Sequence, residues 1–407
     1  MKYKIKDYTF DNGLTLFNMN VPSDDISIIA NVNAGSLYEN NSNAGISHLI
    51  EHMIFKGTKK RPSIGIIHNE LNTLGGENFS YTSIEHSPIW IRVRLNYFDQ
   101  SLDLISDILF NSNMENHEIN KEKEIIIDEI RNRKDDTFTH ICDKFEESLF
   151  EDCEFSRPPI GFENTIRNLK PSEVKESYHK IFNPSNITLF IVGSKSFDKV
   201  KDNIAKYFSN KISGKKYSVP LINVPKNKSR NLYIKRDIDN IHLISGISLP
   251  GLDSDDSYPL NILDHILNSS FSDKILNKEP ISYSRGVTYS AYNIVGYIAA
   301  YANFDKKNYN RVKEVIKEEF SGLNEKEISD SYVEDIINSK INKIILNGSN
   351  TINKAGYLLS SWLAGNIYEI NSSIEKFKSI TKEDIIHVAK KYLSSDNLTC
   401  VNIGKFN

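Results

Sequence analysis

The stretch GISHLIEHMIFKGT, residues 45–58, contains the pattern His-x-x-Glu-His within a helical, largely apolar sequence. In an α-helix, His48 and His52 are four residues apart and lie on one face. Two imidazoles at this spacing can bind one zinc ion, and the Glu51 side chain can reach a water on that metal. A surface helix with two solvated histidines would have the same sequence. A zinc site therefore requires a third ligand from elsewhere in the chain.

The segment 117–133 supplies a candidate for that ligand. Its isoleucines recur at helical spacing and predict a buried stripe. On this helix Glu122 and Glu129 are seven residues apart, which is two turns, so both side chains face the same way. A Glu129 carboxylate would complete a His, His, Glu site and leave the fourth zinc position open to water. Acidic residues on a helix usually form only a solvated face, so the spacing alone leaves that alternative open.

Composition places the chain among ordinary globular proteins. Its 407 residues can bury a large core in two or three domains. A net charge of −3 with both signs mixed gives no reason to expect a nucleic-acid or membrane partner. The three cysteines, Cys142, Cys153 and Cys400, favour a reducing compartment over a disulfide framework. The N-terminal residues contain no apolar signal core, and no apolar run reaches membrane-spanning length, so we expect a cytoplasmic protein. A chain whose targeting segment had been removed would look the same.

Hydrophobic periodicity predicts an α+β fold that occurs twice. In the first half we expect a hairpin over 8–20 about Asn12-Gly13, strands over 26–34, 79–94 and 186–193, and helices over 63–73, 95–112, 117–133, 138–150, 172–181 and 199–209. In the second half we expect strands over 232–235, 241–249, 287–295, 297–304 and 398–404, and helices over 259–267, 309–323, 329–347 and 385–393.

The repeated order predicts two duplicated domains, each a mainly antiparallel sheet covered by helices on one face. We expect a zinc-bearing catalytic domain at 1–212, a linker at 213–230 and a homologous domain at 231–407. At one fixed offset, His48, Glu51, His52 and Glu129 correspond to Asn261, Asp264, His265 and Asn342. The second copy thus lacks the metal ligands, and His265 is expected to be a packed or surface residue. Each chain should carry one zinc site.

These residues resemble the pitrilysin/insulinase-type zinc metallopeptidases, in particular the short two-domain members such as the catalytic subunit of mitochondrial processing peptidase. The resemblance covers nearly the whole chain, and its specific part is the reversed zinc-protease signature at 45–58 with the glutamates that follow. It implies that His48, His52 and Glu129 bind Zn²⁺. It also implies that Glu51 is the general base, and that Glu122 is a supporting carboxylate. The implied activity is that of an endopeptidase that cleaves short or unfolded peptides or precursor segments by a zinc-activated water.

Three departures from the family pattern bear on function. Phe79 occupies the Asn place of the usual Asn-Ala-Tyr-Thr run, and residues 268–270 replace a glycine-rich turn. Active members also place an Arg and a Tyr seven residues apart in the second half, where they hold substrate and stabilise the oxyanion. Tyr289 fits the Tyr position, although it could equally be a strand residue that packs on the sheet. Ser282 stands at the Arg position, and Arg285 is only four residues from Tyr289.

The resemblance also implies a partner, because some members are heterodimers in which one chain supplies zinc and the other the Arg-Tyr pair. This chain has a complete set of candidate zinc residues in its first half but Ser282 at the Arg position, which fits the zinc-bearing subunit. We therefore favour a heterodimer over a homodimer. The alternative is a catalytically weak or inactive structural or binding subunit. The presence of Glu51 argues against that alternative, and the missing Arg argues for it. A zinc-stabilised domain of unrelated function is weaker, since structural zinc sites usually have four protein ligands.

Overall fold

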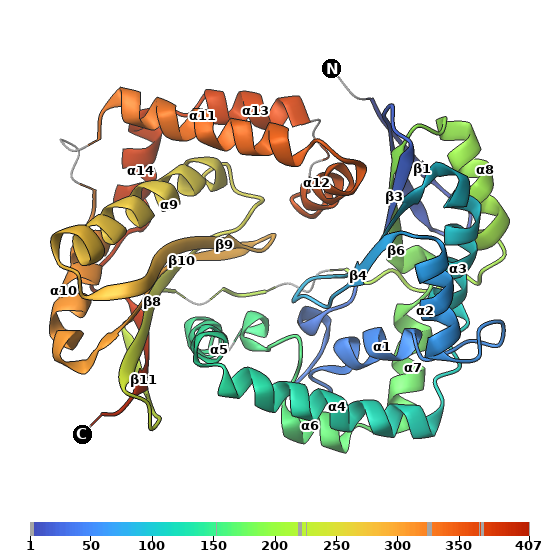
Figure 1. Cartoon of the computed structure of the whole chain (residues 1–407), viewed down its shortest axis with the longest axis horizontal. Coiled ribbons are helices and arrows are strands. Elements are labelled where there is room, and N and C mark those ends of the chain that lie inside the picture. The colour runs from blue at the N-terminus through green and yellow to red at the C-terminus, as the bar shows by residue number, and fades with distance from the viewer. Residues whose placement is uncertain are drawn as a thin grey trace. The chain divides into compact units, whose positions relative to one another are not determined.

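The structure, a computed structural model, describes residues 4–151, 153–218, 222–224, 226–323, 328–365, 367 and 370–406. Part of the expected linker, residues 219–221 and 225, lies outside the described residues. The chain forms two compact units, and each is assembled from three segments (Figure 1). The first unit comprises Met1–Arg131, Arg157–Leu221 and Leu346–Glu369; the second comprises Asn132–Ser156, Ile222–Ile345 and Ile370–Asn407.

A six-stranded sheet forms the centre of the first unit, in the order β1-β2-β6-β3-β5-β4. Its strands are β1 (Ile5–Thr9), β2 (Thr15–Asn20), β3 (Asp25–Val32), β4 (Glu77–Ser80), β5 (Ser87–Arg94) and β6 (Ile187–Gly193). Neighbours pair antiparallel except for the parallel β2–β6 pair. The expected hairpin joins β1 to β2, and Gly13 there adopts a left-handed φ of 87°, which glycine accepts without strain.

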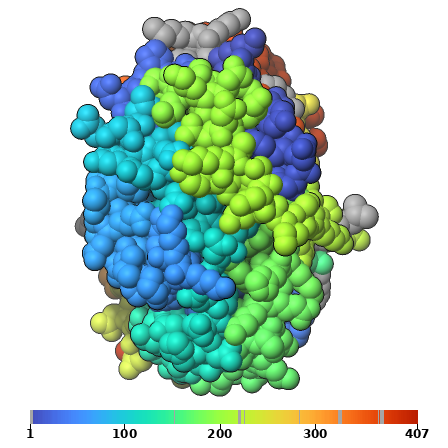
Figure 2. Space-filling view, turned by 90° about the vertical axis from the view of Figure 1, so that its right-hand side faces the viewer, coloured from blue at the N-terminus to red at the C-terminus, as the bar shows by residue number. Residues whose placement is uncertain are grey.

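Helices cover one face of this sheet. They are α1 (Ile46–Ile54), α2 (Ile64–Thr73), α3 (Phe98–Phe110), α4 (Asn116–Asp135), α6 (Glu163–Asn168), α7 (Pro171–Ile181) and α8 (Phe197–Phe208), with 3-10 turns at Ser36–Tyr38, Leu95–Tyr97 and Pro184–Asn186. Alternate residues of β3, such as Ile26 and Ile28, share one buried core with Leu49 of α1 and Ile126 of α4. Figure 2 shows the outer surface of this unit, formed mostly by α2 and α3 (blue to cyan) and α7 and α8 (green).

The second unit repeats this arrangement. Its strands are β7 (Arg230–Lys235), β8 (Asn240–Pro250), β9 (Ser282–Ala291), β10 (Val295–Asp305) and β11 (Thr399–Gly404), in the order β7-β11-β8-β10-β9. The parallel β7–β11 pair matches the β2–β6 pair of the first sheet. Its helices include α9 (Ser257–Ser272), α10 (Tyr309–Phe320), α11 (Asp330–Asn347), α13 (Ile370–Lys378) and α14 (Lys382–Tyr392); short turns lie at Glu154–Ser156, Asp273–Lys278 and Lys306–Asn308. The predicted fold class, two α+β units that each contain a mainly antiparallel sheet with helices, is confirmed.

Each sheet also carries one helix on its second face, and this helix comes from the other half of the sequence. In the first unit, α12 (Thr351–Leu363) packs on β3 and β6 through Leu358 and Ile29 (Figure 1). In the second unit, α5 (Thr137–Leu149) packs on β8 and β11. Hydrophobic periodicity did not predict α12, whose sequence carries Gly356 in its middle. A Cβ atom at Gly356 would lie 2.6 Å from the Trp90 ring, so the close approach requires glycine.

None of the helices among the described residues is long and apolar enough to cross a lipid bilayer.

Candidate metal centre

A buried carboxylate holds the start of α1 in place. Glu39 accepts hydrogen bonds from the backbone N–H groups of Gly45 at 2.7 Å and Ser47 at 2.8 Å. Gly45 has no side chain to cap the helix, so Glu39 satisfies donors that would otherwise be orphaned. Burial raises the pKa of Glu39. The two backbone hydrogen bonds lower it, but the effect of burial is larger and the net shift is upward. The histidine-bearing helix is therefore anchored at its N-terminus by a residue six positions before it.

The three predicted ligands lie together in the first unit. His48 and His52 extend from α1 and Glu129 from α4, and one ligand atom of each lies within 4.8 Å of the other two. Glu129 Oε2 is 3.3 Å from His48 Nε2 and 3.9 Å from His52 Nε2. Zinc bonds of about 2.0–2.2 Å in tetrahedral geometry separate neighbouring ligand atoms by about 3.3 Å. The spacing and the nitrogen-and-oxygen donor set therefore fit zinc with one position left open.

Glu122 sets the orientation of the His52 ring. Its Oε2 lies 3.1 Å from His52 Nδ1, so the ring is directed with Nε2 toward Glu129. The other carboxylate oxygen, Oε1, lies 2.6 Å from the Lys56 ammonium, and the Glu122 side chain is 2% exposed. Burial raises the pKa of Glu122, but the hydrogen bonds of His52 and Lys56 lower it further, and the net shift is downward. The contact of Lys56 with Glu122 was not predicted from the sequence, because the two residues are far apart in the chain.

Glu51 is held by two hydroxyl groups. Ser80 Oγ donates to Oε1 at 2.6 Å and Thr82 Oγ1 donates to Oε2 at 2.8 Å. Glu51 Oε2 also lies 3.5 Å from His48 Nδ1. Burial raises the pKa of Glu51, but His48, Ser80 and Thr82 together lower it below its ordinary value. The carboxylate is therefore ionised, as a general base must be.

The hydroxyl of Ser80 was not identified from the sequence, although a signal for it exists. Residues 80 and 82 are two apart at and just beyond the end of β4, and side chains with this spacing share a face of an extended segment. In the Asn-Ala-Tyr-Thr run of the family that the sequence resembles, alanine stands at the place of Ser80, so the resemblance did not point to a hydroxyl there.

The His48 imidazole lies between two carboxylates. Burial lowers its pKa, but Glu129 and Glu51 raise it more strongly, to about 9. Without a metal, the ring thus carries a proton at neutral pH. Because a ligating imidazole must be neutral, a metal has to displace this proton.

The remaining predicted residues lie in the second unit, on β9. Ser282 is 2% exposed, and its hydroxyl donates to the carbonyl of Asn303 at 2.8 Å. It offers no positive charge to an oxyanion. Tyr289 packs against the core of the second unit, and its hydroxyl is 3.5 Å from the carbonyl of Pro250. Burial raises the pKa of Tyr289, so its phenol keeps its proton.

The counterpart of α1 in the second unit, α9, carries no comparable set of candidate ligands among the described residues. Among the described residues, the cluster formed by His48, His52 and Glu129 is the one group suited to a metal ion. His265 is exposed, in agreement with the sequence-based expectation. Burial raises the pKa of Asp264, at the position matching Glu51, to about 6.

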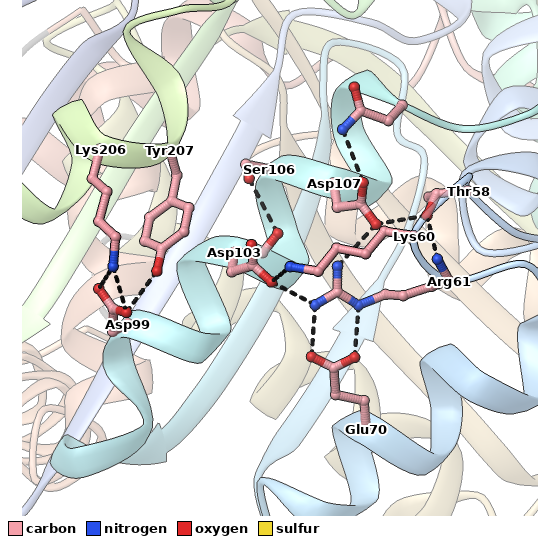
Figure 3. Close-up of polar contacts among 11 residues, drawn as sticks. Thr58, Lys60, Arg61, Glu70, Asp99, Asp103, Ser106, Asp107, Lys206 and Tyr207 are labelled. Atoms are coloured by element: carbon pink, nitrogen blue, oxygen red, sulfur yellow. Dashed lines mark hydrogen bonds and ion pairs between the residues drawn. The ribbon is translucent and has the colours of Figure 1, made fainter.

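A buried arginine fixes the loop that follows α1 (Figure 3). The Arg61 side chain is 3% exposed and pairs with Glu70 of α2 at 2.6 Å. It also pairs with Asp103 at 2.7 Å and Asp107 at 2.8 Å, both on α3. Thr58 donates to the same Asp107 carboxylate at 2.6 Å. The end of α1 is thereby tied to two neighbouring helices.

Two family models match this chain. One, described as insulinase, peptidase family M16, matches residues 16–158. The other, described as the peptidase M16 inactive domain, matches residues 168–340. The first range contains the three candidate metal ligands, His48, His52 and Glu129, and also Glu51. The second contains Ser282 and Tyr289.

Curated relatives span almost the full chain. An uncharacterized zinc protease of Rickettsia felis is 27% identical over 403 residues, covering 97% of this chain and 96% of that protein. The uncharacterized zinc protease YmxG of Bacillus subtilis is 23% identical over 401 residues, covering 96% of each. The beta subunit of the mitochondrial-processing peptidase of Dictyostelium discoideum is 27% identical over 205 residues, covering 50% of this chain and 43% of that protein.

Solved structures share the fold. A protease from Helicobacter pylori superposes with a TM-score of 0.91 at 19% identity, covering 100% of both chains. The periplasmic protease PqqL of Escherichia coli matches with a TM-score of 0.80 at 16% identity, covering 98% of this chain but 47% of that one.

Proposed function

This chain belongs to the insulinase-type peptidase family M16, and on that basis we propose that it is a zinc-dependent endopeptidase. The observation that carries the proposal is the meeting of His48, His52 and Glu129 within 4.8 Å, beside a buried and ionised Glu51. A structural zinc site usually has four protein ligands and no open position, so it does not require a carboxylate beside the metal. We expect short or unfolded peptides and precursor segments as substrates.

In this proposal each residue has a separate role. His48, His52 and Glu129 would hold zinc, which when bound supplies a Lewis acid that polarises the scissile carbonyl and acidifies a water. Glu51 would accept the proton of that water at a carboxylate oxygen and pass it to the leaving amine nitrogen. Ser80 and Thr82 keep the Glu51 carboxylate in place, since each donates to one of its oxygens.

The edge of the first sheet is the proposed binding place for an extended peptide. β4 is the last strand in the sheet order, so one side of its backbone has no neighbouring strand in this sheet. Phe79 on β4 is 48% exposed. A peptide that added to this edge as a further strand would lie alongside Ser80, whose hydroxyl contacts Glu51.

We further propose that the chain works as a dimer, with a heterodimer favoured over a homodimer. The buried Ser282 provides no cation at the Arg position of the family, so a second chain would have to supply it. The match to about half of the PqqL chain supports the same idea, because that single protein has about the length of two such chains.

A catalytically weak or inactive zinc-binding subunit is the second candidate, and the buried hydroxyl of Ser282 is the observation that favours it. A single comparison separates the candidates. Peptide cleavage by the wild-type chain, alone or with its partner, is measured against Glu51→Gln at matched zinc content. Loss of activity in the variant supports the endopeptidase, whereas equal activity in both proteins, or none in either with the partner present, supports the second candidate.

A further inference from the structure

We propose that Lys56 is a positioning residue for the metal centre, acting through Glu122 on the ring of His52. The inference deepens the proposed function, on which it rests. The Glu122 carboxylate contacts both His52 and Lys56. Glu122 Oε2 lies 3.1 Å from His52 Nδ1, while Glu122 Oε1 lies 2.6 Å from Lys56 Nζ.

The arrangement restrains both oxygens of the carboxylate. With one partner at each oxygen, the Glu122 carboxylate cannot rotate without losing a contact. His52 lies in the last turn of α1, and Lys56 follows two residues after the helix ends at Ile54. Both restraints on Glu122 therefore come from one end of one helix, which is itself tied to α2 and α3 through Arg61.

Burial makes this ion pair stronger than a surface pair. The Glu122 side chain is 2% exposed and the Lys56 side chain 18% exposed, so water screens the attraction poorly. A buried carboxylate that loses its cationic partner is strongly destabilised and must find another. Without Lys56, the Glu122 carboxylate would be held by His52 alone, through Oε2, and Oε1 could turn toward a bound metal or take up a proton.

The consequence reaches the metal through the imidazole. A carboxylate that accepts from Nδ1–H fixes the tautomer and the direction of the ring, so that Nε2 is the nitrogen presented to the metal. In this structure His52 Nε2 lies 3.9 Å from Glu129 Oε2, the third ligand atom. Without Lys56, the ring would lose this restraint, and Glu122 could compete with Glu129 for the metal.

The test measures the zinc dissociation constant by competition with a chromophoric chelator. Lys56→Met should weaken zinc binding by about 10- to 100-fold, the usual effect of losing a partner of a ligating histidine. Lys56→Arg, which keeps the charge, should recover most of the affinity. Lys59→Met changes an exposed lysine in the same loop and should leave the affinity unchanged. The cobalt-substituted proteins should show a changed visible spectrum only for Lys56→Met.

The double variant Lys56→Met/Glu122→Gln decides whether Lys56 acts through Glu122. If it does, Lys56→Met should have little further effect once Glu122 is already neutral. Additive losses, or wild-type affinity in Lys56→Met, would overturn the proposal. The melting temperature of each metal-free variant shows whether it is folded, and Lys56→Gln takes the place of Lys56→Met if that variant does not fold.

These outcomes are separate from those of the proposed function. The expected pattern of zinc affinities in a chain that cleaves no peptide would contradict only the endopeptidase. Wild-type zinc affinity in Lys56→Met would contradict only the role of Lys56. A wild-type chain that binds no zinc would overturn both.

Discussion

Ser80 Oγ donates a hydrogen bond of 2.6 Å to Glu51 Oε1, and so links the edge strand of the first sheet to the helix that carries His48 and His52. The donor lies on β4 and the acceptor on α1, 29 positions apart in sequence. Because hydrogen bonds to a carboxylate favour its charged form, this contact helps to keep Glu51 ionised.

Replacement of Ser80 by alanine should move the acid limb of the pH–activity profile to higher pH. The hydroxyl lowers the pKa of Glu51, so its loss raises that pKa, and the base is then protonated at a higher pH than in the wild type. The measurement is kcat/KM against pH. Thr73→Ala, which removes an exposed hydroxyl bonded within α2, is the control. An unchanged acid limb in Ser80→Ala would show that the contact does not affect the base.

Zinc affinity should rise as the pH increases toward about 9. The pKa of His48 in the metal-free chain is raised to about 9, and zinc must displace that proton. Each pH unit below 9 should therefore weaken binding by up to about tenfold. Calorimetric titrations in buffers of different ionisation enthalpy would count the protons released. A pH-independent affinity between pH 7 and 9 would contradict the proposal that His48, which lies between Glu51 and Glu129, is protonated in the metal-free chain.

The His48 imidazole should also make the stability of the metal-free chain depend on pH. The pKa of His48 is raised from 6.5 to about 9, so the folded state binds the proton more tightly than the unfolded state. This stabilisation is fully present below pH 6.5 and is lost as the pH rises to 9. Urea unfolding of the metal-free wild type should show the loss, and His48→Gln should show a smaller one.

Arg61→Met should destabilise the protein by about 3–5 kcal/mol, because it leaves the buried Asp107 carboxylate without its cation. Arg61 is 3% exposed and pairs with Glu70, Asp103 and Asp107. Arg131→Met is the matched control. That side chain is 52% exposed, and its ion pair with Asp128 should contribute less than about 1 kcal/mol. Free energies of unfolding in urea give both values, and equal losses would mean that the Arg61 cluster has no special role.

Two helical glycines should respond to alanine with opposite signs. In Gly356→Ala the new Cβ would lie 2.6 Å from the Trp90 ring, so overpacking should cost about 1–3 kcal/mol. A Cβ atom at Gly65 of α2 would lie 3.9 Å from its nearest neighbour, Ser63 Oγ, so Gly65→Ala should instead stabilise the helix by about 0.5–1 kcal/mol. Melting temperatures of the two variants test the packing of α12 on the first sheet. A stabilising Gly356→Ala would contradict that packing.

Much of the fold and the metal centre was predictable because the relevant signals are local. His48 and His52 share a face through the helical period alone, and the strands of both halves follow from alternation and turn residues. The resemblance then implied that Glu129 is the third ligand, a role that its spacing had left open. The structure brings all three residues together, as expected.

The contacts that complete the site are not local. Lys56, Ser80 and Thr82 are ordinary loop and strand residues in the sequence, and their partners lie on other elements. The pairing of α12 with the first sheet depends on Trp90 and Gly356, which no periodic pattern connects.

The sequence by itself determined the ligand types, their spacing on a helix and the duplication of an α+β unit, because these depend on backbone geometry with a fixed period. Only the tertiary structure decided which side chains restrain Glu51 and Glu122, and which sheet α12 covers. Such contacts depend on distances between elements far apart in the chain, and those distances are set by side-chain packing within each core.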